Sequence, residues 1–260
     1  MKQNSNYITH FSVEKMWGLI NLQWEDICED VNILVGVNGC GKTTFLNLLH
    51  NFYCGEKPDY GSAKGMQGNA VDIPINYIRS FDTPATEIRD KRKKESPLLQ
   101  ELKHRIYQNG EGTSFFDYRM QMLNFPEKAP LILRRIEHFF QLIDSLFTEV
   151  DKRISIDPTS NLLIFTVGRS ANKIHIEQLS AGEKQMLLIL TTVFLQEEKP
   201  CILLMDEPEI SLHISWQDRL IELIRQLNPH CQLILTTHSP NIFANGWEDK
   251  IVFIEDLEDR

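Results

Sequence analysis

The chain has 260 residues, a formal net charge of −9, 42% hydrophobic residues and 24% charged residues. This composition is that of a folded globular protein, long enough for one large or two small domains with a sizeable core. The negative charge excludes nucleic-acid binding through a general positive field, so any such contact needs a local patch or a partner protein.

The cysteines and the N-terminal sequence indicate in which cellular compartment the protein is expected. The cysteines are widely spaced, with no C-x-x-C pair, and are Cys28, Cys40, Cys54, Cys201 and Cys231. Their odd number and spacing predict reduced thiols, not a disulfide framework or a zinc site. The N-terminus lacks the apolar core of a signal peptide, and no run of about 18 apolar residues exists to span a bilayer. We therefore expect a cytoplasmic protein without direct membrane insertion.

The first part of the chain has the pattern of short strands followed by one helix. Apolar and polar residues are interspersed over residues 7–35, and this stretch ends in the run Val31–Val35 (VNILV), typical of a buried parallel strand. After a glycine-rich turn, one face of a predicted helix carries Phe45, Leu48, Leu49 and Phe52. A glycine-rich loop (55–70) and a strand (72–78) follow.

Residues 84–152 predict a mostly helical region. One helix has its apolar positions at Leu98, Leu99, Leu102 and Ile106, and a longer one at Ile132, Ile136, Phe139, Phe140, Ile143 and Phe147. The aromatic face of the longer helix is either core, which we favour, or a docking surface. A basic cluster is either a solvated face, which we favour, or a contact for nucleic acid or an acidic partner; its members are Arg89, Lys91, Arg92, Lys93 and Lys94.

The last part of the chain alternates between strands and helices. After a strand at 161–167, predicted helices at 183–196 and 216–227 alternate with predicted strands at 201–205, 232–236 and 250–254. This alternation implies a parallel α/β sheet, and the helical middle is interpreted as an insertion. We expect a single bilobed domain over 1–260, with one lobe from about 1–83 and 183–260 and an inserted, mostly helical lobe from about 84–182.

Residues 36–43 match the phosphate-binding pattern G-x-x-x-x-G-K-[ST] in full, between a predicted strand and a predicted helix. Glycines let backbone N–H groups turn toward phosphate oxygens, and the helix N-terminus faces the same anion. We expect Lys42 to reach the β- and γ-phosphates and Thr43 to place its hydroxyl on Mg²⁺. The predicted nucleotide-binding residues are Asn38, Gly39, Cys40, Gly41, Lys42, Thr43 and Thr44.

A buried-strand pattern at 201–205 ends in two carboxylates, Asp206 and Glu207. Ligands gather at the carboxyl ends of strands in open α/β sheets. Asp206 suits the Mg²⁺ shell, and Glu207 is placed to orient or deprotonate an attacking water. Alone, this pattern is equally typical of an acidic turn; beside the phosphate-binding pattern it predicts the second half of a nucleotide site.

Two further motifs have both a functional and an ordinary interpretation. The turn Leu179-Ser180-Ala181-Gly182-Glu183 opens a predicted helix and is either a second anion cradle or a capping box formed by Ser180 and Glu183. The segment 236–240 (TTHSP) ends an apolar strand. Its His238 is either a contact to a γ-phosphate or to the attacking water, or a surface histidine.

Taken in order, the phosphate-binding loop, LSAGE, Asp206-Glu207-Pro208 and His238 resemble the motifs of the ABC ATPase superfamily. The resemblance implies an α/β head with a P-loop parallel sheet, an N-terminal antiparallel β part and an inserted helical lobe. It implies ATP and Mg²⁺, with Thr43 and Asp206 at the metal and Glu207, His238 and Lys42 as catalytic residues. It also implies a head-to-tail dimer or higher oligomer, in which the partner's ATP is contacted by Ser180, Ala181, Gly182 and Glu183.

The segment after Glu207 indicates the branch of this superfamily. Transporter subunits usually carry Ser-Ala-Leu-Asp there, whereas residues 207–213 here are EPEISLH. This is similar to the soluble RecF-, SMC- and OLD-like branch, which includes ATPase subunits of anti-phage systems such as Septu and some retrons. Residues 79–81 (RSF) stand where a glutamine loop is expected, and neither Trp17 nor Trp24 is identified as an adenine contact.

Three functions follow as hypotheses. The favoured one is a soluble ATPase switch that works with a separate effector, such as a nuclease or toxin, in genome defence or DNA maintenance. The second is the energy-coupling ATPase subunit of an ABC transporter. The third is a DNA-repair clamp that binds nucleic acid directly.

Overall fold

The computed structural model describes residues 5–55, 63–81, 95–107, 114–168 and 172–258. Contacts divide the chain into two compact units. Unit 1 comprises Met1–Ser80, Gln196–Ile210 and Gln217–Arg260, and unit 2 comprises Phe81–Leu195 and Ser211–Trp216. The basic cluster at residues 89–94 lies outside the described residues.

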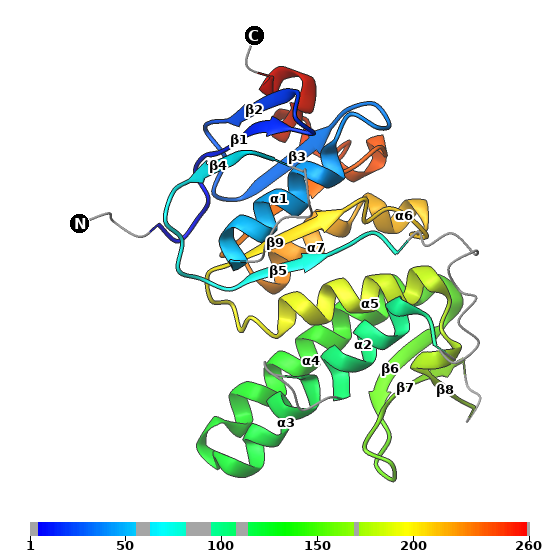
Figure 1. Ribbon diagram of the computed structural model, residues 1–260. Helices are drawn as coiled ribbons and strands as arrows, with labels where there is room; N and C mark the ends of the chain where they lie inside the picture. The colour runs from blue at the N-terminus through cyan, green and yellow to red at the C-terminus, as the bar shows by residue number, and fades with distance from the viewer. Residues whose placement is uncertain (1–4, 56–62, 82–94, 108–113, 169–171, 259–260) are drawn as a thin grey trace. The chain divides into compact units, whose positions relative to one another are not determined.

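Unit 1 is built on a five-stranded parallel sheet, as predicted (Figure 1). Its order is β11-β3-β10-β9-β5. The bounds are β3 (Val31–Val35), β5 (Ile75–Ile78), β9 (Cys201–Asp206), β10 (Cys231–Thr236) and β11 (Ile251–Phe253). The two central strands β9 and β10 are buried at every position, which explains their continuous apolar sequence.

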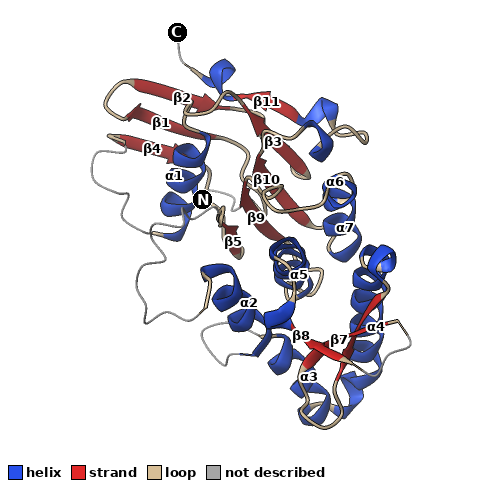
Figure 2. Ribbon diagram, turned by 90° about the vertical axis from the view of Figure 1, so that its right-hand side faces the viewer, coloured by secondary structure: helices blue, strands red, loops and turns tan. Residues whose placement is uncertain are grey.

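Helices cover both faces of this sheet. Figure 2 shows α1 (Lys42–Cys54) and α7 (Leu220–Leu227) on opposite sides of it. The predicted helix 216–227 is divided, because a short α6 (Ile214–Gln217) precedes α7. The division follows from packing in unit 2, where the Trp216 ring lies 5.2 Å from the Phe147 ring and its indole N–H donates to the Leu146 carbonyl.

A three-stranded antiparallel sheet in the order β2-β1-β4 forms the N-terminal β part of unit 1. It comprises β1 (Phe11–Met16), β2 (Ile20–Trp24) and β4 (Gly65–Gly68). Strand β4 lies within the stretch that the sequence predicted to be a loop. Phe11 and Trp24 pack on Phe45 of α1, with ring centroids 5.4 and 6.2 Å away, so Trp24 belongs to the core.

Unit 2 contains most of the helices. They are α2 (Pro97–Tyr107), α3 (Phe115–Asn124), α4 (Ala129–Leu146) and α5 (Ala181–Phe194). It also holds an antiparallel sheet that the sequence did not predict as a whole: β6 (Lys152–Ile156), β7 (Leu163–Val167) and β8 (Lys173–His175). Phe139, Ile143 and Phe147 are buried, so the aromatic face of α4 is core, as favoured.

Helix α5 is buried at nearly every position and packs against α2 inside unit 2. The compact unit therefore extends to Leu195, past the expected lobe boundary at residue 182. The reason is that an all-round apolar helix needs neighbours on every side. The division into one bilobed domain stays a prediction.

Short 3-10 turns complete the described chain: Pro126–Lys128, Thr148–Val150, Ile176–Gln178, Pro240–Ile242, Glu248–Lys250 and Ile254–Leu257. None of the helices in the described ranges combines the length and hydropathy that crossing a bilayer requires.

Candidate nucleotide site

Oxygen atoms from three distant segments meet at the carboxyl ends of β9 and β10. The Thr43 hydroxyl, at the start of α1, donates to both carboxylate oxygens of Asp206 at 3.0 Å. The Thr236 hydroxyl donates to Asp206 Oδ1 at 2.7 Å, because parallel pairing places Thr236 in register with Asp206. Thr236 was not singled out from the sequence, since its position becomes significant only through this register.

The loop 36–41 wraps around the ammonium group of Lys42. Lys42 is 4% exposed, and its Nζ donates to the carbonyls of Gly36 and Val37 at 3.0 and 3.2 Å. Helix α1 begins without a side-chain cap, so its first N–H groups remain for an anion. Gly41 caps this helix at φ 103°, and a Cβ there would lie 2.7 Å from Trp17 Cη2, so the loop requires glycine at this position.

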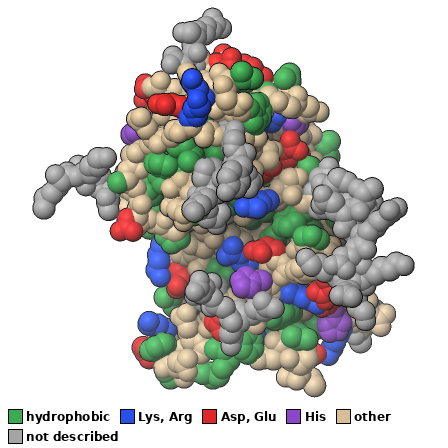
Figure 3. Space-filling view, in the orientation of Figure 1, with side chains coloured by type: hydrophobic (Ala, Val, Ile, Leu, Met, Phe, Trp, Pro, Cys, Tyr) green, Lys and Arg blue, Asp and Glu red, His purple; other side chains and the backbone are tan. Residues whose placement is uncertain are grey.

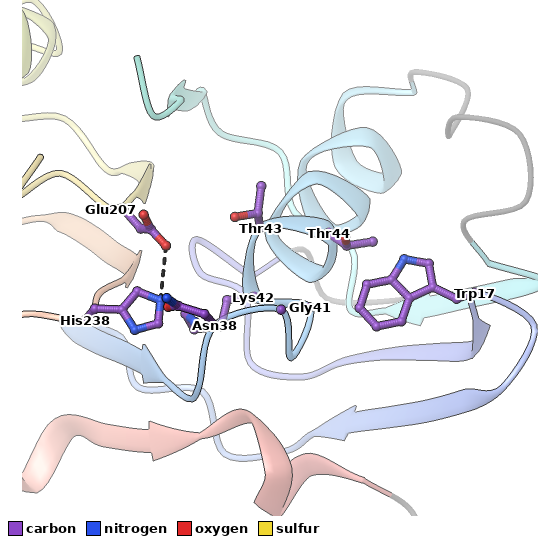
Figure 4. A pocket seen from close by; sticks show the side chains of 9 residues that line it. Trp17, Asn38, Gly41, Lys42, Thr43, Thr44, Glu207 and His238 are labelled. Atoms are coloured by element: carbon purple, nitrogen blue, oxygen red, sulfur yellow. Dashed lines mark ion pairs between the residues drawn. The ribbon is translucent and has the colours of Figure 1, made fainter. Parts of the chain in front are cut away.

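Glu207 occupies a strained backbone conformation directly after Asp206. Its φ is +47°, a region that residues other than glycine rarely adopt. The strain is held by Thr236, whose carbonyl and hydroxyl oxygens both accept from the Glu207 N–H at 3.1 Å. The carboxylate reaches His238, with Oε1 3.2 Å from Nε2 (Figure 4).

The Glu207 carboxyl is a stronger base than an ordinary glutamate. Burial is the main cause that raises its pKa, and the negative charge of Asp206 adds to it, while His238 acts in the opposite direction. A carboxylate with a raised pKa holds a proton more readily, which suits a group that accepts one from water.

Glu209 fixes the backbone of the histidine. Its Oε1 accepts from the His238 N–H at 2.8 Å, so the ring of His238 is presented from an anchored loop. Gln217 ties the same two segments together, because its amide donates to the Glu209 carbonyl at 3.4 Å and accepts from the Ser239 hydroxyl at 2.6 Å. The pattern Glu-Pro-Glu could have indicated a role for Glu209, but in the sequence it indicated only the branch of the superfamily.

The phosphate-binding loop and the Glu207–His238 pair line one cavity of about 330 Å³ in unit 1. Its lining consists of Trp17, Asn38, Gly39, Gly41, Lys42, Thr43, Thr44, Glu207 and His238. Figure 4 shows Trp17 on one side of the loop and the Glu207–His238 pair on the other. Of the predicted nucleotide-binding residues, Cys40 is absent from the lining; its Sγ lies 3.7 Å from Lys42 Nζ.

Trp17 is a second residue of the site that the sequence did not identify as functional. It lies in the turn between β1 and β2 at φ +54°, and 43% of it is exposed. A bulky side chain with positive φ is a structural outlier of the kind that gathers at ligand sites. The signal in the sequence was an aromatic residue next to Gly18 in a hairpin turn.

The signature residues belong to unit 2, at the start of α5. Ser180 and Glu183 form the capping box that was one of the two interpretations: the Glu183 N–H donates to Ser180 Oγ at 3.2 Å, and Glu183 Oε2 accepts from the Ser180 N–H at 2.8 Å. The Glu183 carboxylate is also bonded to Lys152 Nζ at 2.5 Å, so this side chain is engaged within its own unit. Ser180 and Ala181 are exposed.

Gly182 has a packing reason to be glycine. A Cβ at this position would lie 2.2 Å from the backbone carbonyl oxygen of Ser211. Ser211 itself holds a positive φ of 71°, so this carbonyl is set by a tight turn. The glycine of the signature therefore serves the fold of unit 2 whatever else it contacts.

Replacing Gly182 by alanine is expected to destabilise the protein by about 1–3 kcal/mol, because backbone must move to admit the new methyl group. The free energy of unfolding in urea measures this. Ala181→Ser at the exposed neighbouring position is the matched control and should leave it unchanged. A Gly182→Ala variant as stable as the parent would show that the contact with Ser211 is unimportant.

A family model described as "AAA domain, putative AbiEii toxin, Type IV TA system" matches residues 76–244, well over half of the chain. The chain belongs to this family. Its SMC-like fold is shown by a solved structure, the SmcHead bound to the C-winged helix domain of ScpA, with TM-score 0.59, 16% identity and coverage of 95% of this chain and 93% of that one. The family, the fold and the curated ATP-binding relatives together confirm the resemblance to the ABC ATPase superfamily, and the chain is an ABC-type, SMC-like AAA domain.

Curated relatives of this AAA domain come from several kinds of system. "Retron Vc95 probable ATPase" of Vibrio cholerae serotype O1 biovar El Tor is 25% identical over 210 residues, 73% of this chain and 37% of that protein. "Septu protein PtuA" of Bacillus thuringiensis is 23% identical over 266 residues, 82% and 67% respectively. "Putative hemin import ATP-binding protein HrtA" of Staphylococcus aureus (strain MRSA252) is 33% identical over 227 residues, 86% and 82%. The chain thus spans little more than a third of the retron relative.

Proposed function

We propose that this AAA domain is a cytoplasmic switch that binds and hydrolyses ATP with Mg²⁺, dimerises head to tail around the nucleotide and controls a separate effector. Anti-phage defence or DNA maintenance is the proposed setting. The observation that carries the proposal is the cavity that the phosphate-binding loop and the Glu207–His238 pair line together, with Thr43 of that cavity hydrogen-bonded to Asp206.

The donor set at Asp206 fits Mg²⁺. Hydroxyl and carboxylate oxygens of Thr43 and Asp206 lie within 3.0 Å of each other, and Mg²⁺ prefers oxygen ligands. When bound, the ion would neutralise phosphate charge. The protein's own side chains would bind the phosphates and move the proton. Lys42 and the loop N–H groups bind the phosphates, Glu207 accepts the proton of the attacking water, and His238 orients Glu207 and the γ-phosphate.

Trp17 is the proposed surface for the adenine base. Its ring lines the cavity and lies next to Gly41, so a nucleotide whose phosphates lie in the loop has an aromatic face beside it. Stacking of a base on an aromatic side chain is worth about 1–3 kcal/mol.

Ser180 and Ala181 are the proposed contact to the ATP of a second subunit. Both are exposed at the N-terminal end of α5, the end of a helix that favours anions. Glu183 supports this surface through the cap and the Lys152 ion pair.

The retron and Septu relatives favour an effector-coupled role, and HrtA favours the transporter alternative. The EPEISLH segment, which differs from the transporter pattern, supports the former. Direct DNA binding has less support, since on the face drawn in Figure 3 the described basic side chains are interspersed with acidic ones and form no continuous stripe.

The wild-type chain provides the direct test. Phosphate release that requires Mg²⁺, together with a doubling of mass in light scattering when ATP is present, is the expected result. A chain that binds no nucleotide, or hydrolyses it as a monomer, contradicts the proposal. Affinity capture from native cells then separates the settings: a nuclease or toxin supports the effector role, and a membrane permease supports the transporter.

A further inference from the structure

The signature turn, residues 179–183, contains a carboxylate that is engaged through both of its oxygen atoms. Glu183 Oε2 accepts from the Ser180 N–H at 2.8 Å, and Glu183 Oε1 accepts from Lys152 Nζ at 2.5 Å. The side chains of Glu183 and Lys152 are only 8% and 17% exposed. Because water and salt screen a partly buried pair only weakly, the loss of one charge leaves the other uncompensated.

The lysine of this pair comes from an anchored part of unit 2, the start of β6. The Lys152 N–H donates to the carbonyl of the buried Phe147 at 3.3 Å. The preceding residue, Asp151, holds a positive φ of 48°, and its carbonyl accepts from the Gly168 N–H at 2.8 Å. A tight turn thus fixes the backbone from which the ammonium reaches Glu183.

The charge of Glu183 creates a conflict at the start of α5. An acidic side chain in the first turn stabilises a helix, but it opposes a second anion at the same N-terminus. Lys184, the other cation of this turn, donates to the Leu179 carbonyl at 2.5 Å. Among the described residues, Lys152 is the cation within ion-pair distance of Glu183. Without Lys152, a turn that is to contact a phosphate would carry an uncompensated negative charge.

We propose that Lys152 is a positioning residue for the contact to the ATP of a second subunit: it neutralises Glu183, so that this carboxylate caps the Ser180 backbone without repelling the phosphate. This rests on the proposed function. The ammonium holds one carboxylate oxygen while the other holds the Ser180 N–H, so the turn is fixed from within its own unit. Lys152 acts in the subunit that supplies the signature and does not itself touch the nucleotide.

The test compares the ATP-driven dimerisation of full-length variants. Light scattering gives the protein concentration at which the mass doubles in saturating AMP-PNP, a non-hydrolysable analogue. Lys152→Met keeps the apolar stem but removes the charge, so it should need about 10-fold more protein. Lys152→Arg keeps the charge and should stay within about threefold of the parent. At concentrations too low for dimers, both should bind AMP-PNP like the parent, because the phosphate-binding loop is unaltered.

A second substitution separates the effect of the charge from that of the fold. Glu183→Gln in the Lys152→Met background removes the uncompensated carboxylate, and glutamine still completes a capping box. This double variant should again dimerise within about threefold of the parent. Mixing gives another readout: Lys152→Met should recover phosphate release with Lys42→Ala, whose signature is intact. It should not recover with Ser180→Asp, whose signature is also altered.

Lys173→Met is the matched control, because Lys173 of β8 forms an ion pair with the buried carboxylate of Asp157 and not with the signature turn. It should dimerise like the parent. Dimerisation of Lys152→Met at the parent's concentration overturns the proposal, and so does a folded double variant as weak as Lys152→Met. A parent that binds AMP-PNP but stays monomeric instead contradicts the proposed function. Urea unfolding shows which variants are folded. If Lys152→Met is not, Lys152→Gln, whose neutral amide still donates to Glu183, decides.

Discussion

Glu207→Gln is expected to bind ATP as tightly as the parent and to hydrolyse it at least about 100-fold more slowly, the scale of a lost general base. The amide preserves size and a hydrogen-bond acceptor for His238, 3.2 Å away, but it accepts no proton from water. Single-turnover phosphate release measures the loss, and calorimetry measures binding. Because closure precedes hydrolysis in the proposed switch, the variant should also accumulate as a dimer in ATP.

A control variant and the pH profile of the parent test the assignment of Glu207 as the base. Glu222→Gln makes the same chemical change on the exposed side of α7 and should hydrolyse ATP like the parent. The pH profile of the parent should also report Glu207: only the deprotonated carboxylate accepts a proton, so the rate falls as pH decreases through its pKa. Since that pKa is raised above 4.5, the acid limb should lie at higher pH than for an ordinary glutamate. Normal hydrolysis by Glu207→Gln would show that another group is the base.

Lys42→Ala and Ser180→Asp should each be inactive alone and recover activity when mixed. Lys42→Ala removes the ammonium that the loop surrounds and should weaken ATP binding on the order of 100-fold. Ser180→Asp preserves the cap of α5, since aspartate caps helices as well as serine, but it opposes a phosphate with a negative charge. If sites are shared across a head-to-tail dimer, each mixed dimer contains one intact loop facing one intact signature.

The control for this experiment is Ser180→Asn, which caps the helix without the charge and should stay close to the parent. Phosphate release by the mixture is compared with the sum of the two variants measured separately. A mixture no more active than that sum would mean that Ser180 does not serve the ATP of a second subunit. Urea unfolding of each variant shows whether the loss of activity reflects the site or the fold.

Several features of this AAA domain were determined by short segments of sequence. The phosphate-binding loop, the buried strand before Asp206 and the capping box at Ser180 all depend on residues within about one turn or one strand of each other. Backbone conformation and local capping decide such features, and the structure has the loop before α1, the strand and the cap where they were predicted. The apolar positions of α2 and α4 likewise follow from helical periodicity.

Only the tertiary structure decided which distant residues meet. Strand order and register place Thr236 beside Asp206, and a hairpin turn places Trp17 against Gly41. The same holds for the carbonyl of Ser211 against Gly182, the division of α6 from α7 and the sheet within unit 2. Local periodicity does not predict these contacts, because they depend on which strands pair and on which distant segments pack together. The phosphate-binding loop can thus be predicted from eight consecutive residues. The other residues of the cavity come from distant segments, which meet only when the sheet is assembled.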